Sequence, residues 1–150
     1  MIPAPVTASL PANTPQSLAR IRTLEAELLK MPQSQYETQH VLHGGMYART
    51  IMVPAGDIMT GALIKIATVL IVSGDCLVTT GDTTVPMLGY NVLTGSAGRK
   101  QAFLAITDVY MTMLFPTSAK TVAECEEQFT DEYATLMSRH CENDVRITGE

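Results

Sequence analysis

Short runs of β-branched and aromatic residues, separated by turn residues, fill the middle of the chain. Glycine, proline and acidic residues supply the turns, as in Gly44-Gly45 and Pro54-Ala55-Gly56-Asp57. Many short strands at nearly regular spacing are typical of a β-sandwich or a jelly-roll barrel. We therefore predict a mainly β fold with a jelly-roll domain at 33–119. Its strands are expected at 38–43, 46–53, 58–64, 68–72, 76–79, 84–88, 92–93, 101–106 and 109–115.

The residues before this region predict an extended arm followed by an amphipathic helix. Residues 1–13 contain three prolines among small residues, which favours a polyproline-like arm without internal hydrogen bonds. A helix is predicted at 14–32, because Thr14 can cap it and Pro32 ends it. Its apolar positions are Leu18, Ile21, Leu24 and Leu28. We expect a neighbouring subunit to hold the arm through Ile2, Pro3, Pro5, Val6, Leu10 and Pro11.

The residues after the β-rich region predict a second helix at 120–141. Thr121 and Glu124 fit a capping box at its start. The acidic face, which includes Glu126, is expected to be solvated. The apolar positions that carry the prediction are Val122, Cys125, Phe129, Tyr133, Leu136 and Met137. We expect 142–150 to be a polar tail.

Charge is scarce in the middle of the chain, and this bears on partners. Charged residues make up 17% of the sequence, against about 25% in typical soluble domains. A sheet that faces water normally alternates apolar with polar residues. We therefore expect subunit or partner contacts on this region. The alternative is a solvated surface rich in Thr and Ser. The net charge of −5 does not favour nucleic acid or an anionic membrane as a partner.

Two features of the sequence indicate the compartment in which the chain is made. They are the first fifteen residues and the cysteines. Residues 1–15 show neither the basic segment nor the apolar run of a secretory signal. The three cysteines, Cys76, Cys125 and Cys141, are far apart and form no C-x-x-C pair. We therefore expect reduced thiols in a protein made in cytoplasm.

Five short motifs follow one another through the β-rich region. They are Tyr47-Ala48-Arg49, Pro54-Ala55-Gly56, Gly61 with Lys65, Ile71-Val72-Ser73-Gly74, and Gly98-Arg99-Lys100. In order and spacing they resemble a family of small cupin-like proteins encoded in tailed-bacteriophage genomes. The resemblance runs from about His40 to the helix after Thr121, about two thirds of the chain. It implies a cupin-like jelly roll and a place in a virion.

The metal-ligand positions of that family are occupied differently in this sequence. The resemblance places three His and one Glu at positions that carry Ile64, Ala67, Thr68 and Ile106 here. A catalytic cupin metal needs several imidazole or carboxylate ligands, so we expect no metal and no cofactor. His40 and His43 are three apart, so on a continuous strand they point to opposite faces, and only a bend at Gly44-Gly45 would let them hold one ion. We interpret them as a surface or interface pair.

Two other kinds of site remain to be considered, a hydrolase triad and an anion-binding site. Ser73 and Ser96 have no His partner in a nucleophile-elbow context, so a hydrolase triad is not supported. Lys65, Arg99 and Lys100, with Tyr47 and His40, are the candidate residues for binding a carboxylate or a sugar phosphate at the barrel mouth; solvated surface charges are the alternative.

Two functional hypotheses follow. The first is a non-enzymatic virion structural protein, most simply a capsid decoration or cement protein, with the neck or tail as other placements. It is expected to form a homo-oligomer, a dimer or trimer, and to bind the major capsid protein or other virion proteins after synthesis in the host cytoplasm. The second is a metal-free cupin that binds a small molecule or acts like an isomerase.

Overall fold

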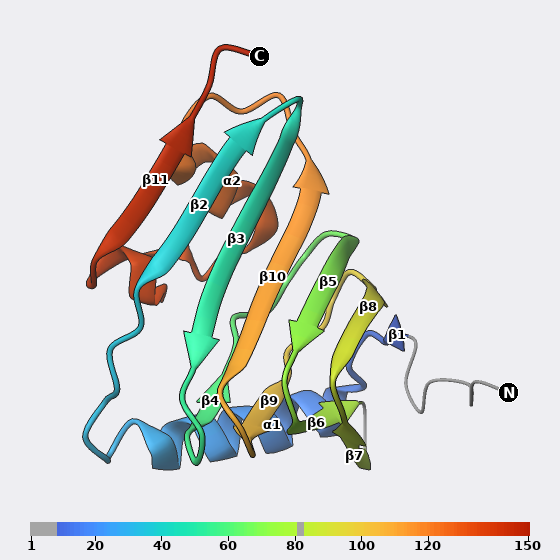
Figure 1. Ribbon diagram of the computed structural model, residues 1–150. Helices are drawn as coiled ribbons and strands as arrows, with labels where there is room; N and C mark the ends of the chain where they lie inside the picture. The colour runs from blue at the N-terminus through green and yellow to red at the C-terminus, as the bar shows by residue number, and fades with distance from the viewer. Residues whose placement is uncertain (1–8, 81–82) are drawn as a thin grey trace, which may run out of the picture.

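Two β-sheets face each other in the computed structural model, which describes residues 9–80 and 83–150 (Figure 1). The larger sheet has the order β1 (Ser9–Leu10), β8 (Tyr90–Gly95), β5 (Thr68–Ser73), β10 (Val109–Pro116), β3 (Met46–Val53), β2 (Thr38–His43) and β11 (Asn143–Ile147). The smaller sheet has the order β4 (Ile58–Thr60), β9 (Ala102–Ala105), β6 (Cys76–Thr80) and β7 (Thr83–Met87). The structure confirms the predicted mainly β sandwich, and nine of its strands match the nine predicted runs within a few residues.

Strand alternation places the core between the sheets. In β2 the side chains of Thr38, His40 and Leu42 are buried, and the residues between them are exposed. The hairpin from β2 to β3 turns at Gly44 and Gly45, whose φ angles of 60° and 71° are readily adopted only by glycine. This turn fixes the register that keeps one face of β2 and β3 inside the sandwich.

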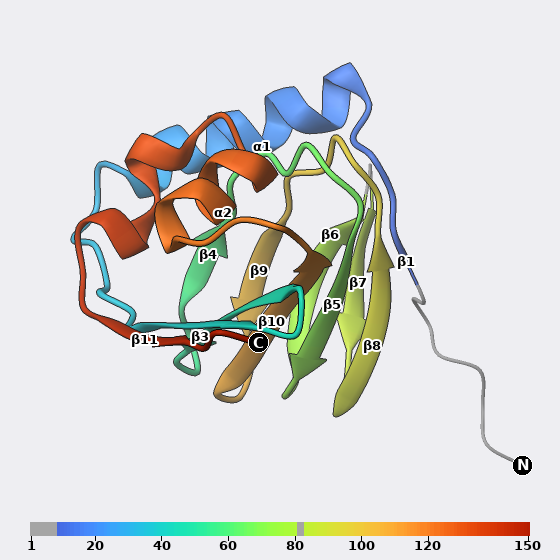
Figure 2. The same cartoon turned by 90° about the horizontal axis from the view of Figure 1, so that it is seen from above.

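Helix α1 (Pro15–Leu28) lies across one end of the sandwich (Figures 1 and 2). The Thr14 hydroxyl accepts a hydrogen bond from the backbone N–H of Ser17 at 3.0 Å, as an N-cap does. Ile21 is the buried member of the predicted apolar stripe, and Leu18, Leu24 and Leu28 are half-buried. The helix ends at Leu28, four residues before Pro32.

The second helix is much shorter than predicted. Helix α2 covers Val122–Phe129, and two short 3₁₀ segments follow, η1 (Tyr133–Thr135) and η2 (Met137–Arg139). Thr130 ends α2 because its backbone is extended and its hydroxyl donates to the carbonyl of Leu63 at 2.8 Å. The solvated face predicted for this helix is also wrong at Glu126, which is 2% exposed.

The predicted polar tail contains an edge strand. Residues Asn143–Ile147 form β11, which pairs in parallel with β2. The backbone of Gly44 also donates to the carbonyl of Glu150 at 2.9 Å. Within the described residues, no helix is long and apolar enough to cross a bilayer.

The described part of the N-terminal arm packs on its own chain. Leu10 is fully buried, and β1 pairs in parallel with β8. The Leu10 carbonyl accepts from the N–H of Ser96 at 2.9 Å, and Asn13 bonds to both Gly98 and Lys100. The prediction that a neighbouring subunit holds Leu10 is therefore wrong. Pro11 is exposed, and Ile2, Pro3, Pro5 and Val6 lie outside the described residues.

Candidate functional site

A cavity of about 660 Å³ opens between the two sheets, beside α1. It is lined by the inner faces of both sheets, by the last turn of α1, and by the segments around residues 31–36 and 132–137. A volume of this size lies within the range of roughly 300–1,000 Å³ that is usual for small-molecule sites. The cavity is therefore the first place to look for a ligand.

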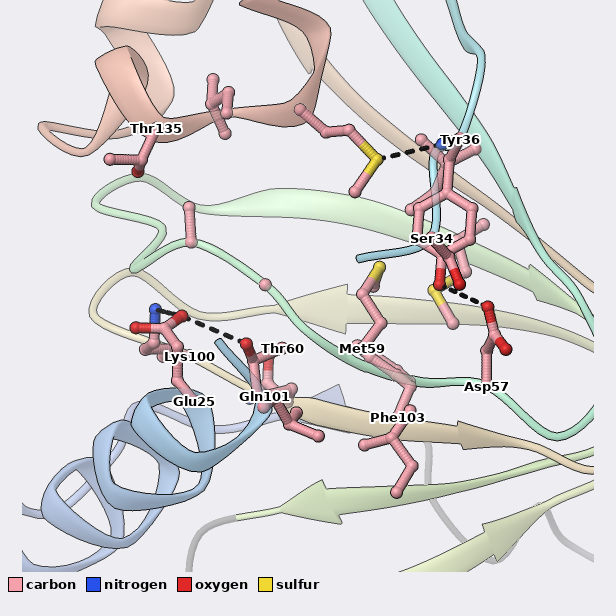
Figure 3. A pocket seen from close by; sticks show the side chains of 18 of the residues that line it. Glu25, Ser34, Tyr36, Asp57, Met59, Thr60, Lys100, Gln101, Phe103 and Thr135 are labelled. Atoms are coloured by element: carbon pink, nitrogen blue, oxygen red, sulfur yellow. Dashed lines mark hydrogen bonds and ion pairs between the residues drawn. The ribbon is translucent and has the colours of Figure 1, made fainter. Parts of the chain in front are cut away.

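The wall of the cavity is largely apolar and rich in methionine. Figure 3 shows Met59 and Phe103, from β4 and β9, near the middle of the site. The larger sheet contributes Ile51, Leu70, Met111 and Met113. Methionine side chains are unbranched and polarisable, so such a wall can adapt to apolar ligands of different shape.

One end of the cavity holds a compensated charge cluster. The Lys100 ammonium is buried and lies 2.8 Å from a Glu25 carboxylate oxygen (Figure 3). It also lies 3.3 Å from a carboxylate oxygen of Glu132. Thr60 donates to Glu25 at 3.1 Å, and Arg22 lies 3.6 Å from Glu132. Burial opposes ionisation of Glu132, but the Leu63 N–H and Lys100 outweigh it and hold its pKa below the ordinary value.

A second polar pair lies away from this cluster. The Tyr36 hydroxyl donates to Asp57 at 2.9 Å (Figure 3). Burial and this hydrogen bond raise the pKa of Tyr36 to about 12, so the phenol stays protonated at neutral pH.

Arg99 lines the cavity as a buried cation without an acidic partner. Its side chain donates to the Thr68 hydroxyl at 2.7 Å and to the Ser96 carbonyl at 3.1 Å, and the residue is 2% exposed. No carboxylate contacts it in the described part of the chain. Burial lowers the pKa of Arg99 to about 10, which leaves the guanidinium charged at neutral pH.

Two buried polar atoms at the cavity have no hydrogen-bond partner within the described residues. They are the Thr38 hydroxyl oxygen and the side-chain nitrogen of Gln101. Both residues line the cavity, and they are 0% and 5% exposed. Buried polar groups in native proteins almost always find a partner, but both atoms have essentially no accessible surface, so a ligand would reach them only after the cavity wall shifts.

The five candidate binding residues from the sequence do not form one site. Arg99 and Lys100 reach the cavity. Lys65 lies on the surface, 2.7 Å from Asp131. His40 and Tyr47 are buried and hydrogen-bonded to each other at 2.6 Å, in a separate cluster against α2 and β11.

That cluster is a buried polar network with a structural role. His40 also contacts the Asn143 side-chain oxygen at 2.6 Å, which ties β2 to β11. Arg49 donates to Glu126 at 3.0 Å, and Arg139 donates to it at 2.6 Å. Ser138 donates to the same carboxylate. Burial alone would raise the pKa of Glu126, but these donors outweigh it and lower the pKa.

The four family metal-ligand positions do not converge either. Ile64 lines the cavity and Thr68 faces the interior beside Arg99. Ala67 and Ile106 are exposed, so these two do not face the barrel interior as the resemblance implies. His40 is buried and His43 is exposed, as their spacing predicts. Across residues 9–80 and 83–150, no group of three or more His, Cys, Asp or Glu is placed to hold a metal.

Several cavity residues carry no signal in the sequence that marks them as part of a site. Glu25, Tyr36, Asp57 and Gln101 come from four separate segments and fit no motif. Only the fold brings them together, so a spacing pattern could not have found them. Arg99 and Lys100 are different, because both are candidate binding residues from the sequence and both line the cavity.

Comparison with known proteins gives likenesses of fold. No protein-family model and no curated protein sequence matches the chain. A cupin-superfamily protein from Desulfitobacterium hafniense is 16% identical over 75% of this chain and 98% of its own, with a TM-score of 0.46. A cupin-2 domain protein from Shewanella frigidimarina is 10% identical over 62% and 91%, with a TM-score of 0.44. A salicylate 1,2-dioxygenase from Pseudaminobacter salicylatoxidans is 13% identical over 76% of this chain and 35% of its own, with a TM-score of 0.49.

Proposed function

We propose that this chain binds a small, largely apolar organic molecule in the cavity between its sheets. The observation that carries the proposal is the largely apolar cavity of ligand size between the sheets. Thr38 and Gln101, two of its lining residues, each hold a buried polar atom without a partner among the described residues. An apolar pocket with a few placed polar groups is the usual composition of a small-molecule site. A ligand with a hydrogen-bonding group would satisfy these atoms once the wall shifts to admit it.

We propose binding without a chemical step. The charged groups around the cavity are largely engaged with one another, Lys100 with Glu25 and Glu132, and Asp57 with Tyr36. Groups held in such pairs orient and fill a site, whereas a general base must be within reach of a substrate proton. This arrangement supports a binding protein over an isomerase-like enzyme.

The test measures the binding of a simple apolar alcohol, 1-octanol, to the protein. Calorimetry gives the affinity, and the chemical shifts of the methionine methyl groups show where the alcohol binds. We expect 1-octanol to shift the cavity methyl groups of Met59, Met111 and Met113. Met59→Trp should weaken binding at least tenfold, because the larger ring occupies the middle of the cavity. Met46→Trp is the matched control, since Met46 is exposed at the start of β3. No binding to the unmodified chain, or equal binding to both variants, would contradict the proposal.

A second candidate is an assembly role, such as a capsid decoration protein or a neck or tail component of a bacteriophage. The observation that favours assembly is the outer face of the larger sheet. Its outward residues on β3, β10, β5 and β8 include no charge. They are Met46, Ala48, Thr50, Met52, Tyr110, Thr112, Leu114, Pro116, Val69, Ile71, Ser73, Tyr90, Val92 and Thr94. Figure 2 shows both helices on the other side of this sheet.

A further inference from the structure

We infer that the ligand of the cavity is an apolar monocarboxylate, and that its carboxylate pairs with Arg99. This inference rests on the proposed function and names the chemical class of the ligand. It begins from the charge balance of the cavity. Arg99 is the cavity cation for which the described residues provide only neutral partners, the Thr68 hydroxyl and the Ser96 carbonyl.

The other charged groups at the cavity have partners of opposite charge or a strong donor. Lys100 lies between Glu25 and Glu132, and Arg49 donates to Glu126. Asp57 accepts from the Tyr36 hydroxyl. A buried charge without a counter-charge is unfavourable, and native proteins pair such groups. A carboxylate brought by a ligand would supply the missing negative charge at Arg99.

The donors beside Arg99 suit a carboxylate head and an apolar body. A guanidinium offers five N–H groups, and the described contacts of Arg99 use two of them. Gln101 lies two residues further along, and its side-chain nitrogen has no partner. Phe103 follows at the same spacing, and all three residues are buried and line the cavity. Along this segment, therefore, Arg99 and Gln101 offer unused N–H donors, and Phe103 then provides an apolar wall.

Packing holds the guanidinium in place. Gly95 lies directly against it, and a Cβ atom at residue 95 would come within 2.5 Å of the Arg99 Cζ. Thr68, the register partner of Gly95 on the neighbouring strand β5, accepts a hydrogen bond from the guanidinium through its hydroxyl. A cation that is already positioned loses little conformational freedom when a ligand binds, which favours a bidentate contact with a carboxylate.

The remaining acids restrict the ligand to a single negative charge. Glu25, Asp57 and Glu132 also line the cavity. A second carboxylate or a phosphate dianion would exceed the one unpaired cation and meet these acids in a site of low dielectric. The site therefore favours a monocarboxylate over a dicarboxylate or a phosphate monoester.

The experiment compares octanoate with 1-octanol, which shares its chain but not its charge, by calorimetry on the full chain. We expect the unmodified protein to bind octanoate at least tenfold more tightly than 1-octanol, as a charge-assisted hydrogen bond predicts. Arg99→Met should remove this preference and leave the affinity for 1-octanol nearly unchanged. Lys65→Met is the matched control, because Lys65 lies on the surface beside Asp131, and it should keep the preference.

Two further measurements keep the inference testable if Arg99→Met does not fold. Gln101→Leu removes an unpartnered amide from the same segment and should reduce the preference for octanoate over 1-octanol severalfold, because a carboxylate accepts a hydrogen bond more strongly than a hydroxyl does. Octanedioate, with a second carboxylate, should bind the unmodified protein more weakly than octanoate. Equal affinity for octanoate and 1-octanol overturns the carboxylate inference but leaves the proposed function standing. Failure of both to bind overturns both.

Discussion

His40 is buried in a state that suits only the neutral imidazole. Its Nε2 can donate to the Asn143 side-chain oxygen, and its Nδ1 then accepts from the Tyr47 hydroxyl. Tyr47 in turn lies within 3.4 Å of an Arg49 nitrogen, which donates to it. Protonation of Nδ1 would leave the Tyr47 hydroxyl without its acceptor. Burial lowers the pKa of His40 below its ordinary value of 6.5, although Asn143 opposes this shift.

The lowered pKa gives stability a pH dependence of known sign. Below about pH 6.5 the unfolded chain binds a proton at His40 that the folded chain does not, so the free energy of unfolding falls as pH falls. We expect urea unfolding of the unmodified protein to show this loss between about pH 7.5 and about pH 5.5. His40→Gln should show a smaller loss over that range.

The exposed His43 provides the control for this titration. It lies three residues from His40 on the same strand, and its contact is the Thr148 hydroxyl at 2.7 Å. His43→Gln should retain the pH dependence of the unmodified protein. The charged groups that face His40 are Arg49 and Glu126, and Glu126, with its lowered pKa, titrates at lower pH than this range. Equal slopes for the two variants would show that His40 is not the group responsible.

Single residues were predictable where their role is local. The spacing of His40 and His43 gave their opposite orientation, and Gly44-Gly45 gave the hairpin. The burial of Arg99 was not predictable, because a cation is normally solvated unless the fold forces it inside. One of its contacts, the Ser96 carbonyl, is local. The other, the Thr68 hydroxyl, is thirty-one residues away, and no local sequence pattern encodes it.

Among the elements, α2 shows how tertiary contacts override a local pattern. Apolar residues recur at helical spacing from Val122 to Met137, yet the helix ends at Phe129. The Lys65 N–H donates to the Phe129 carbonyl at 2.9 Å, and Thr130 bonds to Leu63. These bonds pull the chain out of the helix, and the later apolar residues pack from 3₁₀ segments. The short strand β11 escaped prediction because its alternation spans only five mostly polar residues.

Glu126 is the residue that fastens α2 to the larger sheet, and its loss should be severe. Glu126→Gln removes a buried carboxylate that accepts from Arg49, Arg139 and Ser138. Arg49, only 12% exposed in its side chain, would keep a charge without its partner. We expect a loss of about 3 kcal/mol in the free energy of unfolding, as for other broken buried pairs.

The neighbouring residue on the same helix is the control for this substitution. Glu127 is exposed, and Glu127→Gln should change the free energy of unfolding by less than about 0.5 kcal/mol. Both variants are measured by urea unfolding near neutral pH. Equal free energies of unfolding for the two variants would show that the contacts of Glu126 do not stabilise the attachment of α2 to the larger sheet.

At the scale of the whole molecule, the scarcity of charged residues in the sequence corresponds to one uncharged outer face, that of the larger sheet. The core explains the inward residues of the larger sheet, but it does not explain outward Val69, Val92 and Tyr110, which are 43%, 57% and 55% exposed. At one edge of this sheet, Asp144 and Arg146 on β11 form an ion pair at 3.6 Å. An apolar centre with a polar rim is the usual anatomy of a protein interface.

A second copy of the chain is the occupant that we propose for this face. Two copies related by a two-fold axis bring like residues together, and an uncharged face avoids repulsion between molecules that each carry a net charge of −5. The four strands that carry these residues, about 4.8 Å apart and about six residues long, span roughly 19 by 20 Å. This flat area of roughly 400 Å² is about half of the 800 Å² or so per partner that a standard interface removes from water.

The proposal predicts a concentration-dependent dimer that a single central charge disrupts. We expect sedimentation velocity to show dimers of the unmodified chain, and Val69→Glu to weaken association at least tenfold, because the dimer would bury two unpaired carboxylates. Ile106→Glu is the matched control, since Ile106 is 52% exposed in the turn between β9 and β10, away from the outer positions of the sheet. A monomer at every concentration, or equal weakening by both variants, would mean that this face does not join two copies. A dimer that resists Val69→Glu would place the contact elsewhere on the molecule.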